Sequence, residues 1–151
     1  MITGMAAAAV FAGACLLVPA ELPAQSAVAV APVLGAREAH AAALAGQVVL
    51  VDIRTPAEWR ATGVPASGHA ITMHQAPEAF LREISAATSG SKSRPIALIC
   101  ATGNRSALIQ TILRQAGYTD VADVAEGMSG GRRGDGWIKA GLPVRTWSAS
   151  R

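Results

Sequence analysis

The sequence has few residues of the kinds that bind metals or nucleic acids. Its 151 residues include two cysteines and three histidines, whose spacing fits no common metal site. The thirteen basic residues are scattered, with only Arg132 and Arg133 adjacent, whereas a nucleic-acid-binding protein carries a basic stripe or cluster. We therefore expect no metal, no organic cofactor and no nucleic-acid partner. The net charge of +3 at most favours small anionic ligands.

The sequence also lacks an apolar run of the ~20 residues that a membrane-spanning helix needs. The segment from Met5 to Ala20 is almost wholly apolar, but it has the length of the apolar region of a secretory signal peptide. Small residues suited to cleavage follow between Ala20 and Ala29. We therefore predict a signal peptide at residues 1–26 and a periplasmic or secreted protein without stable membrane insertion.

One feature of this N-terminal segment departs from the usual pattern. The residues before the apolar run, "MITGM", include no Lys or Arg. A start codon further upstream would explain this, and so would an uncleaved leader that tethers the protein to a membrane. Both alternatives stay open.

After cleavage the chain would contain a single cysteine, Cys100, because Cys15 lies within the apolar run. A lone thiol cannot form an internal disulfide in an exported protein. It is either a buried structural residue, as free cysteines often are, or a reactive thiol. The position of Cys100 between a predicted strand and a predicted helix favours the reactive thiol.

Strand and helix patterns alternate along the chain. Residues 48–53 and 95–100 are continuous apolar runs, as is typical of strands buried on both faces of a parallel sheet. The alternation predicts an α/β fold for residues 27–148, a three-layer α/β/α arrangement with a largely parallel central sheet of about five strands. Further strands are expected at residues 27–33, 69–73 and 119–124, and helices at residues 35–46, 76–88, 104–117 and within 137–144. The apolar face expected of the third helix comprises Ala107, Leu108, Ile112 and Leu113.

The segment "CATGNRS", from Cys100 to Ser106, joins the second apolar run to the third helix. Its small residues let the backbone curl, and Gly103 can adopt a positive φ without strain. Backbone N–H groups in such a loop converge near a helix N-terminus, where the helix dipole also favours an anion. We expect this environment to lower the pKa of the Cys100 thiol from ~8.5 to ~3.5–7.5. We also expect Arg105 to attract an anionic substrate, and Cys100 to be a nucleophile that needs no histidine base.

Three segments of the chain, in this order, resemble the signatures of the single-domain rhodanese family of sulfurtransferases. "VLVDIRTPAEW" (Val49 to Trp59) resembles the first signature, an Asp-x-Arg strand end followed by an acidic and an aromatic residue. "CATGNRS" resembles the Cys-x-x-Gly-x-Arg-Ser active loop, and "EGMSGGRRGDGWIKAGLPV" (Glu126 to Val144) resembles the closing segment. The resemblance, to the exported bacterial type, covers about residues 28–147.

The resemblance implies a thiosulfate sulfurtransferase that carries a persulfide on Cys100. A small anionic donor such as thiosulfate would supply the sulfur, and cyanide, a thiol or a partner protein would accept it. Asp52 and Arg54 would support the site by joining the first strand end to neighbouring loops through hydrogen bonds and an ion pair. Structural roles are expected for His69 and His74. The loop would bind the substrate through Ala101, Thr102, Gly103, Asn104, Arg105 and Ser106.

Two other functions stay open on this fold. A rhodanese-like module could hold or relay sulfur, or dock a partner, without turnover. The intact Cys100 and Arg105 count against a pure docking module, because such a module would tolerate their loss. A phosphatase or arsenate reductase on a related fold has an active loop one residue longer, because its ring of amides wraps a tetrahedral oxyanion. The six positions from Cys100 to Arg105 form the shorter loop, which fits a single outer sulfur and favours sulfur transfer.

Overall fold

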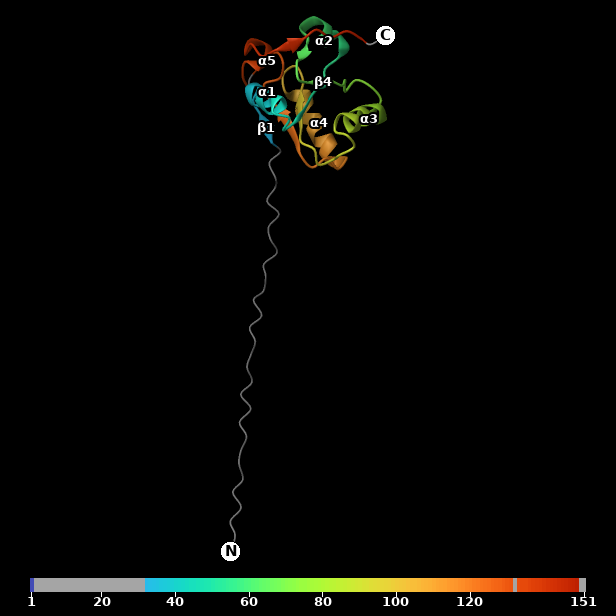
Figure 1. Cartoon of the computed structure of the whole chain (residues 1–151), viewed down its shortest axis with the longest axis vertical. Coiled ribbons are helices and arrows are strands. Elements are labelled where there is room, and N and C mark those ends of the chain that lie inside the picture. Colours follow the sequence, from blue (N-terminus) through green and yellow to red (C-terminus); the bar gives the residue numbers. More distant parts are fainter. Residues whose placement is uncertain (2–31, 132, 150–151) are drawn as a thin grey trace.

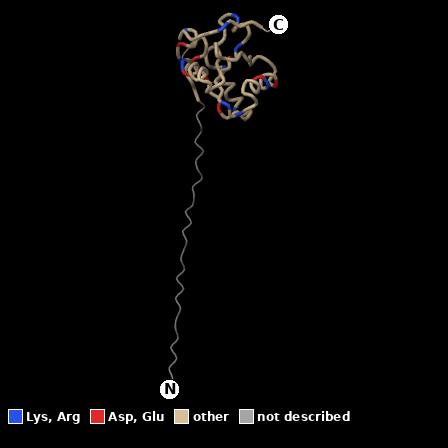
Figure 2. Tube along the Cα trace, in the orientation of Figure 1, with Lys and Arg blue, Asp and Glu red and all other residues tan. Residues whose placement is uncertain are grey.

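The computed structural model describes Met1, residues 32–131 and residues 133–149. The predicted signal peptide, Cys15 and residues 27–31 of the expected first strand lie outside the described residues. Among the helices of the described part, none is long and apolar enough to cross a membrane. Figure 2 shows Lys and Arg interspersed with Asp and Glu along this part of the chain.

A five-stranded sheet in which every pairing is parallel forms the centre of the fold (Figure 1). In spatial order its strands are β1 (Val33–Leu34), β6 (Val121–Val124), β5 (Ile96–Ile99), β2 (Val49–Asp52) and β4 (His69–Ala70). Every residue of the three inner strands is buried. A parallel sheet of this kind needs both of its faces covered.

Helices cover the two faces: α1 (Ala36–Leu44) and α5 (Gly136–Lys139) on one, α3 (Pro77–Ala87) and α4 (Asn104–Gln115) on the other. Successive residues of β2 point to opposite faces, as in any strand. Val49 and Val51 pack in the core that includes α3 and α4, whereas Leu50 packs in the core that includes α1 and α5. The predicted three-layer α/β/α fold is therefore confirmed.

Three short elements are not predicted from the sequence. Helix α2 (Pro56–Thr62) follows β2, and strands β3 (Val64–Pro65) and β7 (Val144–Arg145) form a separate antiparallel pair. Each is too short for a hydrophobic period to appear in its sequence. For β4 the prediction of a strand over residues 69–73 is too long, since only two of those residues are in the strand.

The buried face of α4 differs from the predicted one. Leu108 and Ile112 are 55% and 42% exposed, so the expectation that both face the core is wrong. The residues that are buried on this helix are Ser106, Ile109, Gln110 and Leu113. Gln110 fixes the orientation, because its Nε2 donates to the carbonyls of Pro32 and Val121, each at 2.8 Å. Because two of the four buried residues, Ser106 and Gln110, are polar, the spacing of apolar side chains does not reveal which face of α4 is buried.

Candidate active site

Cys100 lies between the end of the central strand β5 and the start of α4. Asp52 ends the neighbouring strand β2 and is in register with Ile99. Because the two strands run in the same direction, their carboxyl ends meet at one edge of the sheet, where ligands of such folds bind. Asp52 and the Cys100 loop are thus brought to the same edge.

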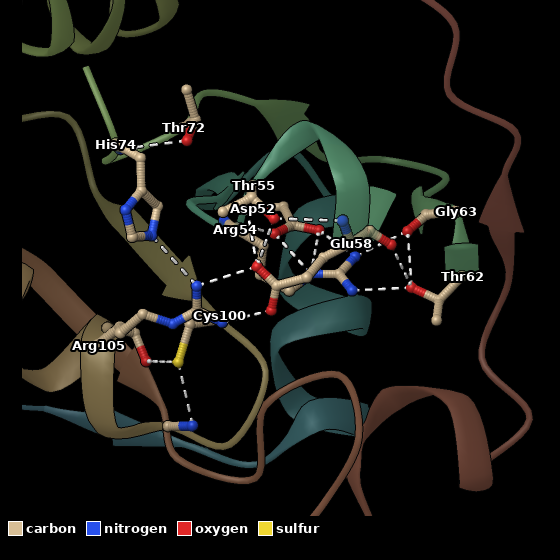
Figure 3. Close-up of polar contacts among 12 residues, drawn as sticks. Asp52, Arg54, Thr55, Glu58, Thr62, Gly63, Thr72, His74, Cys100 and Arg105 are labelled. Carbon is tan, nitrogen blue, oxygen red and sulfur yellow. Dashed lines mark hydrogen bonds and ion pairs between the residues drawn. The ribbon is translucent and has the colours of Figure 1, made fainter. Parts of the chain in front are cut away.

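The Cys100 loop holds its sulfur atom by hydrogen bonds (Figure 3). Gly103 is in the left-handed conformation, with a φ of 86°, and its N–H donates to Cys100 Sγ at 3.2 Å. The hydroxyl of Ser106 donates to the same atom at 3.4 Å. Cys100 is only 1% exposed, so these protein donors replace water around the sulfur.

The surroundings of the sulfur determine its charge. Burial by itself raises the pKa of the Cys100 thiol, because it takes the thiolate out of water. Hydrogen bonds from Ser106, Thr102 and Gly103 stabilise the thiolate and outweigh burial, so the pKa lies below its ordinary value. This is the direction expected from the loop sequence, and it makes Cys100 a candidate nucleophile.

The glycine-rich segment after β6 packs against the back of this loop. The N–H groups of Met128 and Ser129 donate to the carbonyls of Cys100 and Ala101, each at 2.8 Å. Gly127 has a φ of 67°, and a Cβ atom at this position would lie 2.4 Å from the Ala101 oxygen. So close an approach requires glycine. The segment therefore holds the active loop in its curled shape.

Helix α2 contributes Glu58, the acidic residue of the first signature, for which the sequence predicts no role in the site. The Glu58 N–H donates to Thr55 Oγ1 at 3.2 Å, and the Thr55 N–H donates to Glu58 Oε2 at 2.9 Å, which together form a capping box. Pro56 occupies the first turn, where its fixed φ suits a helix. The pattern Thr-Pro-x-Glu after a buried strand is the signal that could have located this carboxylate.

Arg105 pairs with Glu58 (Figure 3). Its Nη1 donates to Glu58 Oε2 at 3.0 Å, and its Nη2 donates to the other carboxylate oxygen. The hydrogen bond from Arg105 lowers the pKa of Glu58 to about 2, so the carboxylate is ionised at neutral pH. The charge of Arg105 is therefore partly offset within the site, and the attraction of an anionic substrate by Arg105 stays a prediction.

His74 also contacts Arg105 (Figure 3). Its Nε2 is 3.3 Å from Arg105 Nη1, and because a guanidinium can only donate, the histidine nitrogen is the acceptor. The sequence predicts only a structural role for His74, and no motif links it to Arg105, 31 residues away.

Asp52 and Arg54 form the ion pair expected of them. Both are buried, and the Arg54 guanidinium donates to the Asp52 carboxylate at 2.7 to 3.1 Å. Arg54 also donates to Thr62 Oγ1 at 2.8 Å and to the Gly63 carbonyl at 2.7 Å, at the end of α2 (Figure 3). Among the described residues, neither side chain is hydrogen-bonded to the Cys100 loop. The pair instead holds α2, and with it Glu58, against β2.

Two other residues of the loop, Thr102 and Asn104, line a pocket of about 420 Å³ together with Gly131 and Arg133. The pocket lies beside the loop, at the N-terminal end of α4. In the part of the chain that the structure describes, no three His, Cys, Asp or Glu side chains are grouped as a metal site.

Comparison with known families identifies the domain. Residues 36–133 match the model of the rhodanese-like domain family. The chain belongs to this family. All of the site residues described above lie within the rhodanese-like domain so defined. No curated protein matches the sequence at a significant level.

Several solved structures share the rhodanese-like fold. Rv0390 from M. tuberculosis is 28% identical, with a TM-score of 0.62 over 78% of this chain and 98% of that chain. A polysulfide-sulfur transferase from Wolinella succinogenes has a TM-score of 0.59 over 76% of this chain and 78% of that chain, and at 22% identity it supports the fold alone. A protein of unknown function from Rhodopseudomonas palustris, described as a possible tyrosine phosphatase, is 26% identical, with a TM-score of 0.52 over 76% of this chain and 85% of that chain.

Proposed function

We propose that this rhodanese-like domain is a sulfurtransferase that carries sulfur as a persulfide on Cys100. The observation that supports this most directly is the buried Sγ atom, which accepts from the Gly103 N–H and the Ser106 hydroxyl. The same loop suits the outer sulfur of a persulfide, which is also an anion that charge-assisted hydrogen bonds stabilise. The donor is thiosulfate or a similar small anion, and the acceptor is cyanide, a thiol or a partner protein.

The proposed reaction consists of two displacements. In the first, the Cys100 thiolate attacks the outer sulfur of thiosulfate, the donor S–S bond breaks, and sulfite leaves with the bonding electron pair. In the second, the acceptor attacks the outer sulfur of the persulfide, and the Cys100 thiolate is the leaving group. Because the first product leaves before the acceptor reacts, the kinetics are ping-pong, and double-reciprocal lines should be parallel.

A phosphatase is the second candidate, because the Rhodopseudomonas palustris neighbour is described as a possible tyrosine phosphatase. The six-position span from Cys100 to Arg105 argues against it, since the related folds that handle phosphate have a longer loop. Hydrolysis of a phenyl phosphate ester by the purified protein, abolished in Cys100→Ser, would favour the phosphatase over the sulfurtransferase.

The intact mass of the full chain after incubation with thiosulfate tests the sulfurtransferase. We expect the wild type to gain the mass of one sulfur atom, which a thiol reductant removes. Cys100→Ser should gain nothing, whereas Cys15→Ser, which removes the other cysteine, should gain sulfur as the wild type does. A folded wild-type chain that gains no sulfur from thiosulfate or from a polysulfide would contradict the proposal and favour a binding module.

We further propose, from the sequence of the first 29 residues, that the protein is exported to the periplasm or secreted. N-terminal sequencing of the protein recovered from cells tests this proposal. A new N-terminus between Ala20 and Ala29 is the expected result. An intact N-terminus in the membrane fraction would instead indicate a tether.

A further inference from the structure

The proposed sulfur donor is an anion, yet the arginine of the active loop is already paired. Both oxygens of the Glu58 carboxylate accept hydrogen bonds from the Arg105 guanidinium. A dianion such as thiosulfate is bound best beside a cation whose charge is not offset in this way. Arg133, which lines the pocket beside the loop, is also paired with a carboxylate, but through a single hydrogen bond to Asp123.

The pocket and the sulfur share the active loop, although Cys100 itself is not among the lining residues of the pocket. Thr102 and Asn104 flank Gly103, whose N–H donates to Cys100 Sγ, and they face Gly131 and Arg133 across the pocket. Its volume of about 420 Å³ leaves ample room for a small oxyanion, since a water molecule occupies ~30 Å³. None of the four lining residues is acidic, and the hydroxyl, amide and guanidinium side chains can all donate to an anion.

Arg133 is anchored but keeps most of its donors. Its Nη1 is 3.3 Å from Oδ2 of Asp123, whose side chain is only 2% exposed, whereas the Arg133 side chain is 52% exposed. Within the described residues, Asp123 is the sole hydrogen-bond partner of the Arg133 side chain. A guanidinium has five N–H donors, so the others are free to bind a ligand.

The partner of Arg133 offsets its charge less fully than Glu58 offsets that of Arg105. Asp123 accepts one hydrogen bond from Arg133, whereas Glu58 accepts two from Arg105. Arg133 is therefore the cation of the site that is better able to take an anionic ligand.

We propose that the pocket of Thr102, Asn104, Gly131 and Arg133 binds the oxyanion part of the sulfur donor, with Arg133 as the residue that recognises it. The proposal rests on the proposed function and adds the residues that recognise the donor. When the Cys100 thiolate takes the outer sulfur of thiosulfate, the S–S bond breaks and its electron pair stays with sulfite. Sulfite then lies in the pocket, where Arg133 stabilises its charge.

Binding of thiosulfate to Cys100→Ser tests the pocket without chemistry, because this variant has no thiolate to accept sulfur. In calorimetric titrations, adding Arg133→Gln to this background should weaken binding by about 10- to 100-fold, as for the loss of a charged hydrogen bond. Arg133→Lys keeps the positive charge but loses the paired N–H donors of the guanidinium, and it should weaken binding less than Arg133→Gln does. The matched control is Arg82→Gln, an exposed arginine of α3, which should leave the affinity unchanged.

A second variant guards against loss of folding. Arg133→Gln leaves the buried Asp123 carboxylate without a counter-charge, which can destabilise the protein. Combining Arg133→Gln with Asp123→Asn removes both charges and should show the same weakened binding. An affinity for thiosulfate in this double variant equal to that of the parent would overturn the proposal.

Turnover with Cys100 intact separates this inference from the proposed function. Arg133→Gln should raise the KM for thiosulfate about 10-fold or more, and the variant should still gain one sulfur at saturating thiosulfate. If Arg133→Gln transferred sulfur with an unchanged KM for thiosulfate, the proposed role of the pocket would be wrong and the proposed sulfurtransferase activity would stand. If thiosulfate binding depended on Arg133 but the wild type transferred no sulfur, the proposed binding pocket would stand and the proposed sulfurtransferase activity would be wrong.

Discussion

Among single residues, Ser106 has the most direct influence on the charge of Cys100. Burial raises the pKa of the thiol, and the hydrogen bond from the Ser106 side chain is the largest of the effects that oppose it. Ser106 is itself fully buried, so no water can take the place of its hydroxyl without rearrangement. Among the donors of the loop, the Ser106 hydroxyl therefore contributes most to the stability of the thiolate.

Ser106→Ala should raise the pKa of the Cys100 thiol. Alkylation by iodoacetamide, measured by mass spectrometry on the peptide that contains Cys100, should slow by about 2- to 10-fold at neutral pH. Thr111→Ala is the matched control, because Thr111 lies on the same helix but donates to the Ala107 carbonyl at 3.3 Å. Equal alkylation rates for Ser106→Ala and the wild type across the pH range would contradict this role of Ser106.

Glu58 should make the stability of the fold depend on acid pH. The hydrogen bond from Arg105 lowers its pKa from 4.5 to about 2. A lowered pKa means that the stabilising effect is complete above pH 4.5 and is lost as the pH falls through about 2. Glu58→Gln should therefore unfold more easily in urea at neutral pH, by about 1 kcal/mol for a pair that is partly exposed. This difference should close as the pH approaches 2, and a difference that stays constant with pH would argue against the pair.

At the scale of elements, the active loop and the segment after β6 fit together as one unit. A Cβ atom on Gly103, which has a φ of 86°, would lie 2.1 Å from the Ala125 oxygen. Gly46 has a comparable φ of 68°, but nothing lies within 4 Å of its Cβ position. Alanine substitutions at these two glycines therefore separate the cost of a left-handed backbone from the cost of a steric clash with the Cβ atom.

Gly103→Ala should displace the loop and abolish the gain of sulfur mass, with a larger loss of unfolding free energy than Gly46→Ala. For Gly46→Ala we expect only the conformational cost of a left-handed residue, about 1–2 kcal/mol, and normal sulfur uptake. Chemical unfolding and intact mass measure the two effects. A Gly103→Ala protein that takes up sulfur as the wild type does would show that the close contact is not needed.

At this scale, the sequence predicts the features that are encoded within one continuous segment of the chain. The inner strands and the Cys100 loop are continuous segments, so their apolar runs and small residues are visible in the sequence. Glu58 and His74 reach Arg105 from 47 and 31 positions away, and only the folded backbone brings them together. The face of α4 was misassigned for a similar reason, since Gln110 is held by carbonyls from two distant segments.

At the scale of the whole molecule, the pair of Asp52 and Arg54 joins the large sheet to the small one. Asp52 ends β2, and Arg54 donates to the carbonyl of Gly63, the residue before β3. β3 pairs in turn with β7, near the C-terminus. One buried ion pair thus connects parts of the chain that are far apart in sequence.

Arg54→Met should lower the free energy of unfolding by about 3–5 kcal/mol, because it leaves the Asp52 carboxylate buried without a partner. Adding Asp52→Asn should recover part of this loss, since the unpaired charge is gone. Asp135→Asn, which breaks the exposed pair with Lys139, should leave the midpoint of urea unfolding unchanged. If the double variant were no more stable than Arg54→Met, the unpaired charge would not be the cause of the loss.

The parallel sheet also gives the molecule two different ends. Cys100 follows the carboxyl end of β5, whereas Pro32 precedes the amino end of β1, so the two residues lie at opposite ends of the sheet. The chain before Pro32 therefore joins the domain on the side that faces away from the sulfur.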